Sequence, residues 1–154
     1  MKAVERDVAE SPATPGDARV VTSRTFPADR TAPRAAAAWL RSLSLGLSET
    51  RLSDAELCVD ELVTNLVRYA WADGAAHALT VRIERSPSEV EITVEDDGRP
   101  FDPNDAPVSL PARSLAEAVP GGRGLMLVRS IAPRLRYERR DGRNRVTVAF
   151  PLEG

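Results

Sequence analysis

The sequence predicts an α+β protein in which helices cover one face of a mixed, mostly antiparallel sheet. The main evidence is a pair of segments, 78–85 and 89–96, that carry aliphatic residues at every second position. The short polar link between them, which includes Pro87 and Ser88, favours an antiparallel hairpin. Because Arg and Glu fill many of the alternate positions, one face is apolar and the other charged. This pattern predicts a two-layer sandwich with helices on one side only.

The flanking segments fit the same architecture. Segment 1–18 is charged and rich in small residues, so we expect a disordered tail before a single domain at 19–154. A strand is predicted at 19–26 and an Ala-rich helix at 33–45. A closing hairpin is predicted at 135–138 and 145–150, around an Asp-Gly turn at 141–142.

An amphipathic helix at 54–70 carries the first candidate site. Ser53 and Glu56 have the spacing of a capping box, and apolar residues recur at intervals of three and four. Glu61 and Asn65 lie one above the other beside the apolar face. The carboxylate could accept a proton from a hydroxyl or water, and the amide oxygen suits Mg²⁺. The alternative is an ordinary polar stripe on a half-buried helix.

Asp96 and Gly98 directly follow the second hairpin strand. A carboxylate there can accept a hydrogen bond from an exocyclic amine, and Gly98 lets a flat ring approach the backbone. The alternative is a plain turn, because Asp-Gly is a common turn dipeptide.

A glycine cluster at 121–124 opens a predicted helix, where free N–H groups can hold phosphates. Glycines can also begin a helix for packing reasons alone. The preceding segment, 102–120, is rich in proline and has no lasting periodicity, which is typical of a functional or mobile loop.

Composition excludes several classes of protein. With a net charge of −2, the chain shows no charge signature of nucleic-acid or anionic-membrane binding. The sole lysine, Lys2, and the missing phosphate-loop motif exclude a P-loop nucleotide site.

A single cysteine, Cys58, excludes an internal disulfide and is interpreted as a packing residue. The lone His77 excludes a His-rich zinc site. No apolar run or signal peptide is present, so we expect a cytoplasmic protein.

The three motifs occur in a specific order: ELVTN on a helix, VEDDGRPFDP after a strand, and GGRGLMLVRSI at a helix start. This order resembles the GHKL ATPase superfamily, and within it the small anti-sigma-factor serine/threonine kinases of the RsbW and SpoIIAB type. The resemblance covers about residues 19–152.

The resemblance implies a Bergerat ATP-binding fold with ATP and Mg²⁺ as its ligands. It implies that Glu61 is the general base, that Asn65 holds Mg²⁺ against the phosphates and that Asp96 bonds the adenine amine beside Gly98. Segment 102–120 would be the ATP lid. The remaining implied nucleotide-binding residues are Gly121, Gly122, Arg123, Gly124 and Leu125.

The resemblance further implies transfer of the γ-phosphoryl group to a Ser or Thr of an anti-anti-sigma protein with a STAS domain. It implies sigma-factor binding when that partner is absent, and a homodimer. An alternative is a non-catalytic module in which ATP switches a protein-binding surface. A histidine kinase and a gyrase-like motor fit poorly, because neither a phosphoacceptor helix nor a transducer domain is evident.

Overall fold

The computed structural model describes residues 4–8, 19–104 and 122–152. These residues form one sheet, with strand order β1-β2-β3-β4-β6-β5 and antiparallel pairing between every two neighbours. The predicted mixed character is therefore absent from the described pairings. The strands are β1 (Val4–Val8), β2 (Val20–Pro27), β3 (Ala78–Arg85), β4 (Glu89–Asp96), β5 (Arg134–Arg140) and β6 (Arg143–Pro151).

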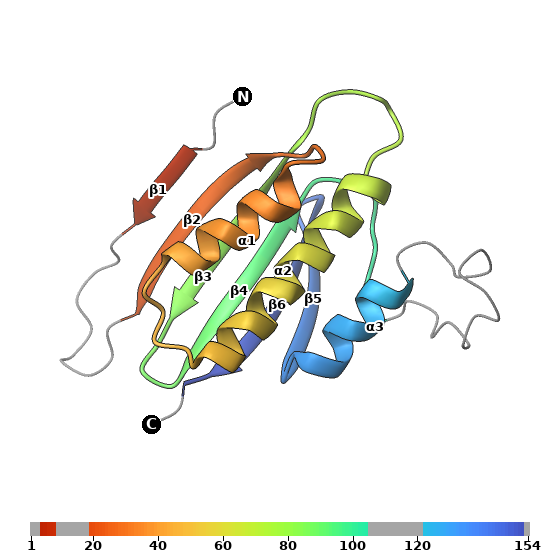
Figure 1. The fold of residues 1–154 in the computed structure, drawn as a ribbon. Helices are drawn as coiled ribbons and strands as arrows, with labels where there is room; N and C mark the ends of the chain where they lie inside the picture. The colour runs from red at the N-terminus through yellow and green to blue at the C-terminus, as the bar shows by residue number, and fades with distance from the viewer. Residues whose placement is uncertain (1–3, 9–18, 105–121, 153–154) are drawn as a thin grey trace.

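Three helices lie on one face of this sheet, as Figure 1 shows. They are α1 (Ala32–Ser42), α2 (Glu49–Tyr69) and α3 (Gly122–Ile131). The predicted two-layer sandwich is confirmed. The alternation of the hairpin strands explains it, because Val81 pairs with Val94 and Ile83 with Ile92, and all four side chains are buried beneath the helices.

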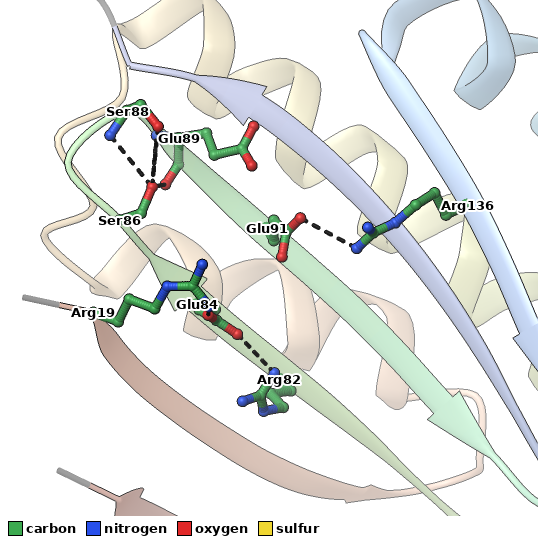
Figure 2. A network of polar contacts seen from close by, with 8 residues as sticks. All are labelled: Arg19, Arg82, Glu84, Ser86, Ser88, Glu89, Glu91 and Arg136. Carbon is green, nitrogen blue, oxygen red and sulfur yellow. Dashed lines mark hydrogen bonds and ion pairs between the residues drawn. The ribbon is translucent and has the colours of Figure 1, made fainter. Parts of the chain in front are cut away.

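The opposite face of the sheet carries paired charges. Figure 2 shows Glu84 between Arg19 and Arg82, and Glu91 beside Arg136. Arg19 lies just before β2, Arg82 is two positions from Glu84 on β3, and Arg136 of β5 reaches Glu91 of β4 across β6, so the charged face satisfies much of its own charge. Surface pairs of this kind contribute little stability each, but they keep an uncovered sheet face polar.

The start of α2 differs from the prediction. The helix begins at Glu49, and Ser48 is its N-cap, with Oγ accepting a hydrogen bond from the backbone N–H of Arg51 at 3.2 Å. The capping box predicted at Ser53 is wrong, since that residue lies inside the helix. The extra turn includes Leu52, which continues the apolar spacing of Ala55 and Val59. On its exposed side Arg41 of α1 pairs with both Glu49 and Glu56.

Two other segments bear on the predicted boundaries. Residues 4–8 form β1, which pairs with β2 through backbone hydrogen bonds, so this part of the predicted disordered tail is a strand. The edge of β2 offers unpaired backbone groups, and pairing with them needs no apolar side chains. Most of the predicted lid at 102–120 lies outside the described residues.

The closing hairpin is confirmed and is longer than predicted. Asp141 and Gly142 connect β5 and β6, and both have positive φ, 53° and 74°. Positive φ at two successive positions is the backbone of a type I′ turn, whose twist matches that of the flanking strands. This turn fixes the register of β5 and β6, in which Asn144 lies opposite Arg139, and on its other side Asn144 pairs with Asp96 of β4.

Candidate functional site

The carboxylate of Asp96 is buried at the end of β4, with only 1% of the residue exposed. Its Oδ1 accepts hydrogen bonds from the N–H of Gly98 at 2.8 Å and from Asn144 Nδ2 at 3.1 Å. Its Oδ2 is buried and has no partner among the described residues. A buried carboxylate oxygen without a donor is costly, so its position indicates a site for a ligand N–H.

Two opposing influences act on the pKa of Asp96. Burial raises the pKa of the carboxyl above its ordinary value, because the charged form loses hydration. The hydrogen bonds from Asn144 and Gly98 act in the opposite direction and favour the carboxylate. These two hydrogen bonds therefore help to keep Asp96 ionised, so that it can accept a further hydrogen bond.

Asn144 is a functional candidate that the sequence analysis missed. It lies on β6, is 2% exposed, and its Nδ2 contacts Asp96 Oδ1, Gly98 O at 3.3 Å and Arg99 O at 2.8 Å. It thus ties the strand-end carboxylate to the loop that follows. The sequence does contain a clue. Asn144 occupies the same alternating set of strand positions as Val146 and Val148, which face inward, and it is polar.

The side chain of Asn144 is itself held in place from β5. Its Oδ1 accepts hydrogen bonds from Tyr137 Oη at 2.6 Å and from an Nη of Arg139 at 2.9 Å. The same Arg139 nitrogen donates to Gly98 O at 3.1 Å. These contacts fix the orientation of the amide, so that its nitrogen faces Asp96.

Gly98 is required for close packing against the end of α2. A Cβ at this position would lie 2.6 Å from both the Cβ and the carbonyl oxygen of Ala70, and 2.9 Å from Asp96 Oδ1. The next residue, Arg99, donates from its backbone N–H to Ala70 O and from Nε to Tyr69 O. The loop after β4 is therefore fixed to the C-terminal end of α2.

Glu61 and Asn65 are half-buried on α2, one helical turn apart. Among the residues that the structure describes, neither side chain has a hydrogen-bond or ion-pair partner. Gly124 of α3 approaches Glu61 so closely that a Cβ on it would collide with the Glu61 carboxylate. The predicted acid therefore lies against the start of α3, which brings the first and third motifs together.

The remaining residues that were predicted to bind the nucleotide lie around the start of α3. Gly122 begins α3, Gly121 lies outside the described residues, and nothing is described of the Arg123 side chain. Leu125 is 4% exposed and belongs to the hydrophobic core, so its role is to anchor α3 rather than to offer a polar contact.

The two ends of this site are spaced along α2. Glu61 and Tyr69 are separated by about 12 Å along the helix axis, from the rise of 1.5 Å per residue. Asp96, Gly98 and Asn144 lie at the Tyr69 end, and the start of α3 lies at the Glu61 end. The arrangement suits a long ligand with a donor-bearing ring at one end and an anionic group at the other.

These residues also fit Mg²⁺ and a nucleotide. The unpaired Asp96 Oδ2 suits an exocyclic amine, and the amide oxygen of Asn65 and the carboxylate of Glu61 are hard oxygen ligands. Within the described ranges, no helix is long and apolar enough to span a membrane.

Residues 26–150 match the family described as the histidine kinase-like ATPase domain. The chain belongs to this family. Over 92 residues it is 39% identical to the serine/threonine-protein kinase BtrW of Bordetella bronchiseptica, an alignment that spans 60% of this chain and 65% of that protein. The chain thus spans less than two thirds of that relative's length.

The fold also resembles a solved structure, the crystal structure of the RsbU and RsbW domains of Rv1364c from Mycobacterium tuberculosis. The TM-score is 0.62, with 18% identity, over 86% of this chain and 32% of that one. At this identity the likeness concerns the fold alone. Family membership implies ATP binding, and the fold agrees with the predicted Bergerat arrangement.

Proposed function

We propose that this domain binds ATP with Mg²⁺ and transfers the γ-phosphoryl group to a Ser or Thr of a protein that contains a STAS domain. The observation that carries this proposal is the arrangement along α2. Among the described residues, a buried Asp96 oxygen without a partner lies at one end, and at the other the unpartnered Glu61 lies against Gly124 near the start of α3, with Asn65 one helical turn away. The name of the relative BtrW, a serine/threonine-protein kinase, supports the reaction type.

Each end of the site has its own task in this proposal. Asp96 Oδ2 accepts a hydrogen bond from the adenine amine, and Asn144 keeps the other oxygen of that carboxylate occupied. Asn65 holds Mg²⁺, and the N–H groups at the start of α3 hold phosphate oxygens. When bound, Mg²⁺ neutralises phosphate charge that would otherwise repel the incoming hydroxyl.

Glu61 accounts for the proton that is released in the transfer step. The acceptor hydroxyl oxygen forms a bond to the γ-phosphorus while the bond from that phosphorus to the β-γ bridging oxygen breaks, and ADP leaves. The proton of the hydroxyl passes to the Glu61 carboxylate, which is half-buried and has no competing partner among the described residues.

The partners in this proposal are an anti-anti-sigma protein with a STAS domain as phosphoacceptor and a sigma factor as the alternative partner. A homodimer would be the assembled form. These assignments rest on the resemblance of the motifs to the anti-sigma kinases, and the matched families and folds are compatible with them.

The decisive experiment incubates the chain with γ-labelled ATP and each STAS-domain protein of the same genome. Label should appear on a Ser or Thr of the acceptor, and Glu61→Gln should reduce the rate by at least 100-fold with little change in ATP affinity. Glu49→Gln is the matched control, because this acid lies on the same helix, is exposed and contacts only Arg41 among the described residues.

Two results would count against the proposal. Transfer by Glu61→Gln at the normal rate would remove the assigned base. ATP-dependent binding of the STAS-domain protein without any label transfer would replace the kinase by a non-catalytic module, in which ATP only switches the binding surface.

A further inference from the structure

A groove lies on the outer side of the helical layer, between α1 and α2. Its volume is about 990 Å³. The residues that line it from the α1 side are Arg30, Thr31, Pro33, Arg34, Ala35 and Ala38, and those from α2 are Asp60, Thr64, Val67 and Arg68. Ala35 and Ala38 supply small side chains to the α1 side of the lining.

The charge of this groove is unbalanced. Three arginines, Arg30, Arg34 and Arg68, line it, and Asp60 is the one carboxylate among its lining residues. Within the described part of the chain, none of the three arginines has an ion-pair or hydrogen-bond partner. Asp60 accepts a hydrogen bond from the hydroxyl of Thr64 at 3.2 Å.

Several arginines elsewhere in the chain are paired with carboxylates. Arg41 is paired with two glutamates, and Arg82 and Arg136 are paired on the uncovered sheet face (Figure 2). The chain has 23 acidic residues and a net charge of −2, so carboxylates are available to neutralise arginine. A groove with three unneutralised guanidinium groups therefore favours an acidic partner.

The groove runs beside the catalytic residues. Asp60 and Thr64 precede Glu61 and Asn65 by one residue each, which places the two pairs about 100° apart around α2. The lining from Asp60 to Arg68 covers about 12 Å of the helix, the same stretch that carries the proposed nucleotide site. A segment bound in the groove lies alongside that site and outside it.

We infer that this groove docks an acidic segment of the phosphoacceptor protein, an inference that rests on the proposed kinase function. Guanidinium groups at the rim bind carboxylates of the segment, in two-point geometry where the carboxylate faces the fork. Asp60 accepts from an N–H of the same segment. Nucleic acid fits less well, because its backbone offers only acceptors and would face the Asp60 carboxylate.

The test uses the full chain, the STAS-domain protein of the same genome that binds it or accepts label from it, and γ-labelled ATP. The double variant Arg34→Glu with Arg68→Glu should raise the KM for the acceptor at least tenfold, while kcat and the Kd for ATP stay within twofold. Arg34→Lys with Arg68→Lys should keep most of the acceptor affinity. The matched control is Arg136→Glu, which changes an exposed arginine on the opposite face of the sheet.

The outcomes separate this inference from the proposed function, with acceptor binding measured in parallel by calorimetry. An unchanged acceptor KM and Kd in the double variant would overturn the groove and leave the kinase standing. Binding without label transfer by the wild-type chain would overturn the kinase. In that case, loss of binding in the double variant still supports the groove. If the wild-type chain binds no acceptor, both fail. If DNA binds the wild-type chain and the double variant loses only that binding, the groove belongs to nucleic acid.

Discussion

The two ends of the candidate nucleotide site are built differently. At the purine end, Asp96, Gly98 and Asn144 are joined by hydrogen bonds that leave a single carboxylate oxygen without a partner. At the phosphate end, the side chains of Glu61 and Asn65 have no hydrogen-bond or ion-pair partners among the described residues, and Gly124 of α3 approaches Glu61 closely.

This difference means that the purine end is preorganised by hydrogen bonds, whereas the side chains of the phosphate end are not yet held by partners. A preorganised acceptor costs little further ordering when the purine binds, which favours affinity and selectivity. Side chains without partners can reorient around a metal ion and phosphates, which is where charge must be rearranged during transfer. Changes at the purine end should therefore affect binding, and changes at the phosphate end should affect transfer.

The largest effect is expected from Asp96→Asn. Asn144 and Gly98 donate to one oxygen, and the ring amine would donate to the other, so an amide NH₂ must face a donor in either orientation. ATP affinity should fall about 100-fold, equivalent to about 2.7 kcal/mol. Calorimetric titration measures it, with Asp97→Asn as the neighbouring control. Affinity within threefold of wild type would refute the assignment of the purine end.

Gly124→Ala should show the opposite pattern. The added methyl group collides with the Glu61 carboxylate and displaces it, while Asp96 is untouched. We expect label transfer to fall by roughly 10- to 100-fold, because small misplacements at a reacting centre are costly, with ATP affinity changed by less than about fivefold. Single-turnover rates and ATP titrations compare the two quantities. An equal loss of affinity and rate would contradict the proposed separation of the ends.

Asn144→Ala tests how the purine end is maintained. The change removes the three hydrogen bonds that Asn144 Nδ2 donates, and only Arg99 O is left without another donor among the described residues, so the free energy of unfolding should fall by about 2 kcal/mol, measured by urea denaturation. It also removes a hydrogen bond that lowers the pKa of Asp96, so that pKa should rise further. Thr93→Val is the control, because its hydroxyl pairs with Thr147 on the opposite face.

The pH dependence of ATP affinity is a more specific test of Asn144→Ala than its effect on stability. ATP binding needs the Asp96 carboxylate as an acceptor, so affinity is present above its pKa and is lost as the pH falls through it. Because burial already raises this pKa, and the variant raises it further, affinity should begin to fall at a higher pH than in the wild-type chain. Coincident pH profiles for the two proteins would show that Asn144 serves packing only.

The smallest effect is expected when thiol reagents are applied to Cys58, which is buried in the hydrophobic core. Burial raises the pKa of this thiol to about 12, with a smaller contribution from the charge of Asp54. The thiolate is the reactive form, so thiol reagents should modify the native chain at pH 8 very slowly, with or without ATP. Fast labelling, monitored by mass spectrometry and compared with urea-unfolded protein, would mean that the core opens readily.

Much of the fold and part of the site follow from local sequence pattern. Strands β3 and β4 lie where alternation predicts them, because each strand buries one face and period-2 alternation records that directly. The predicted start of α2 was too late because Ser53 and Glu56 also fit the spacing of a capping box, whereas the N-cap is Ser48. The strand β1 was missed because backbone pairing with β2 leaves little trace in side-chain type.

The sequence by itself determined strands β2 to β6, the helices on one face and the identity of Glu61, Asn65, Asp96 and Gly98 as candidates. Each of these is a matter of spacing along one element, which local geometry fixes. Only the tertiary structure decided that Gly124 lies against Glu61, and that Asn144 holds Asp96 from a strand 48 positions away. Contacts of this kind depend on strand register and helix packing, and neither can be calculated from one segment alone.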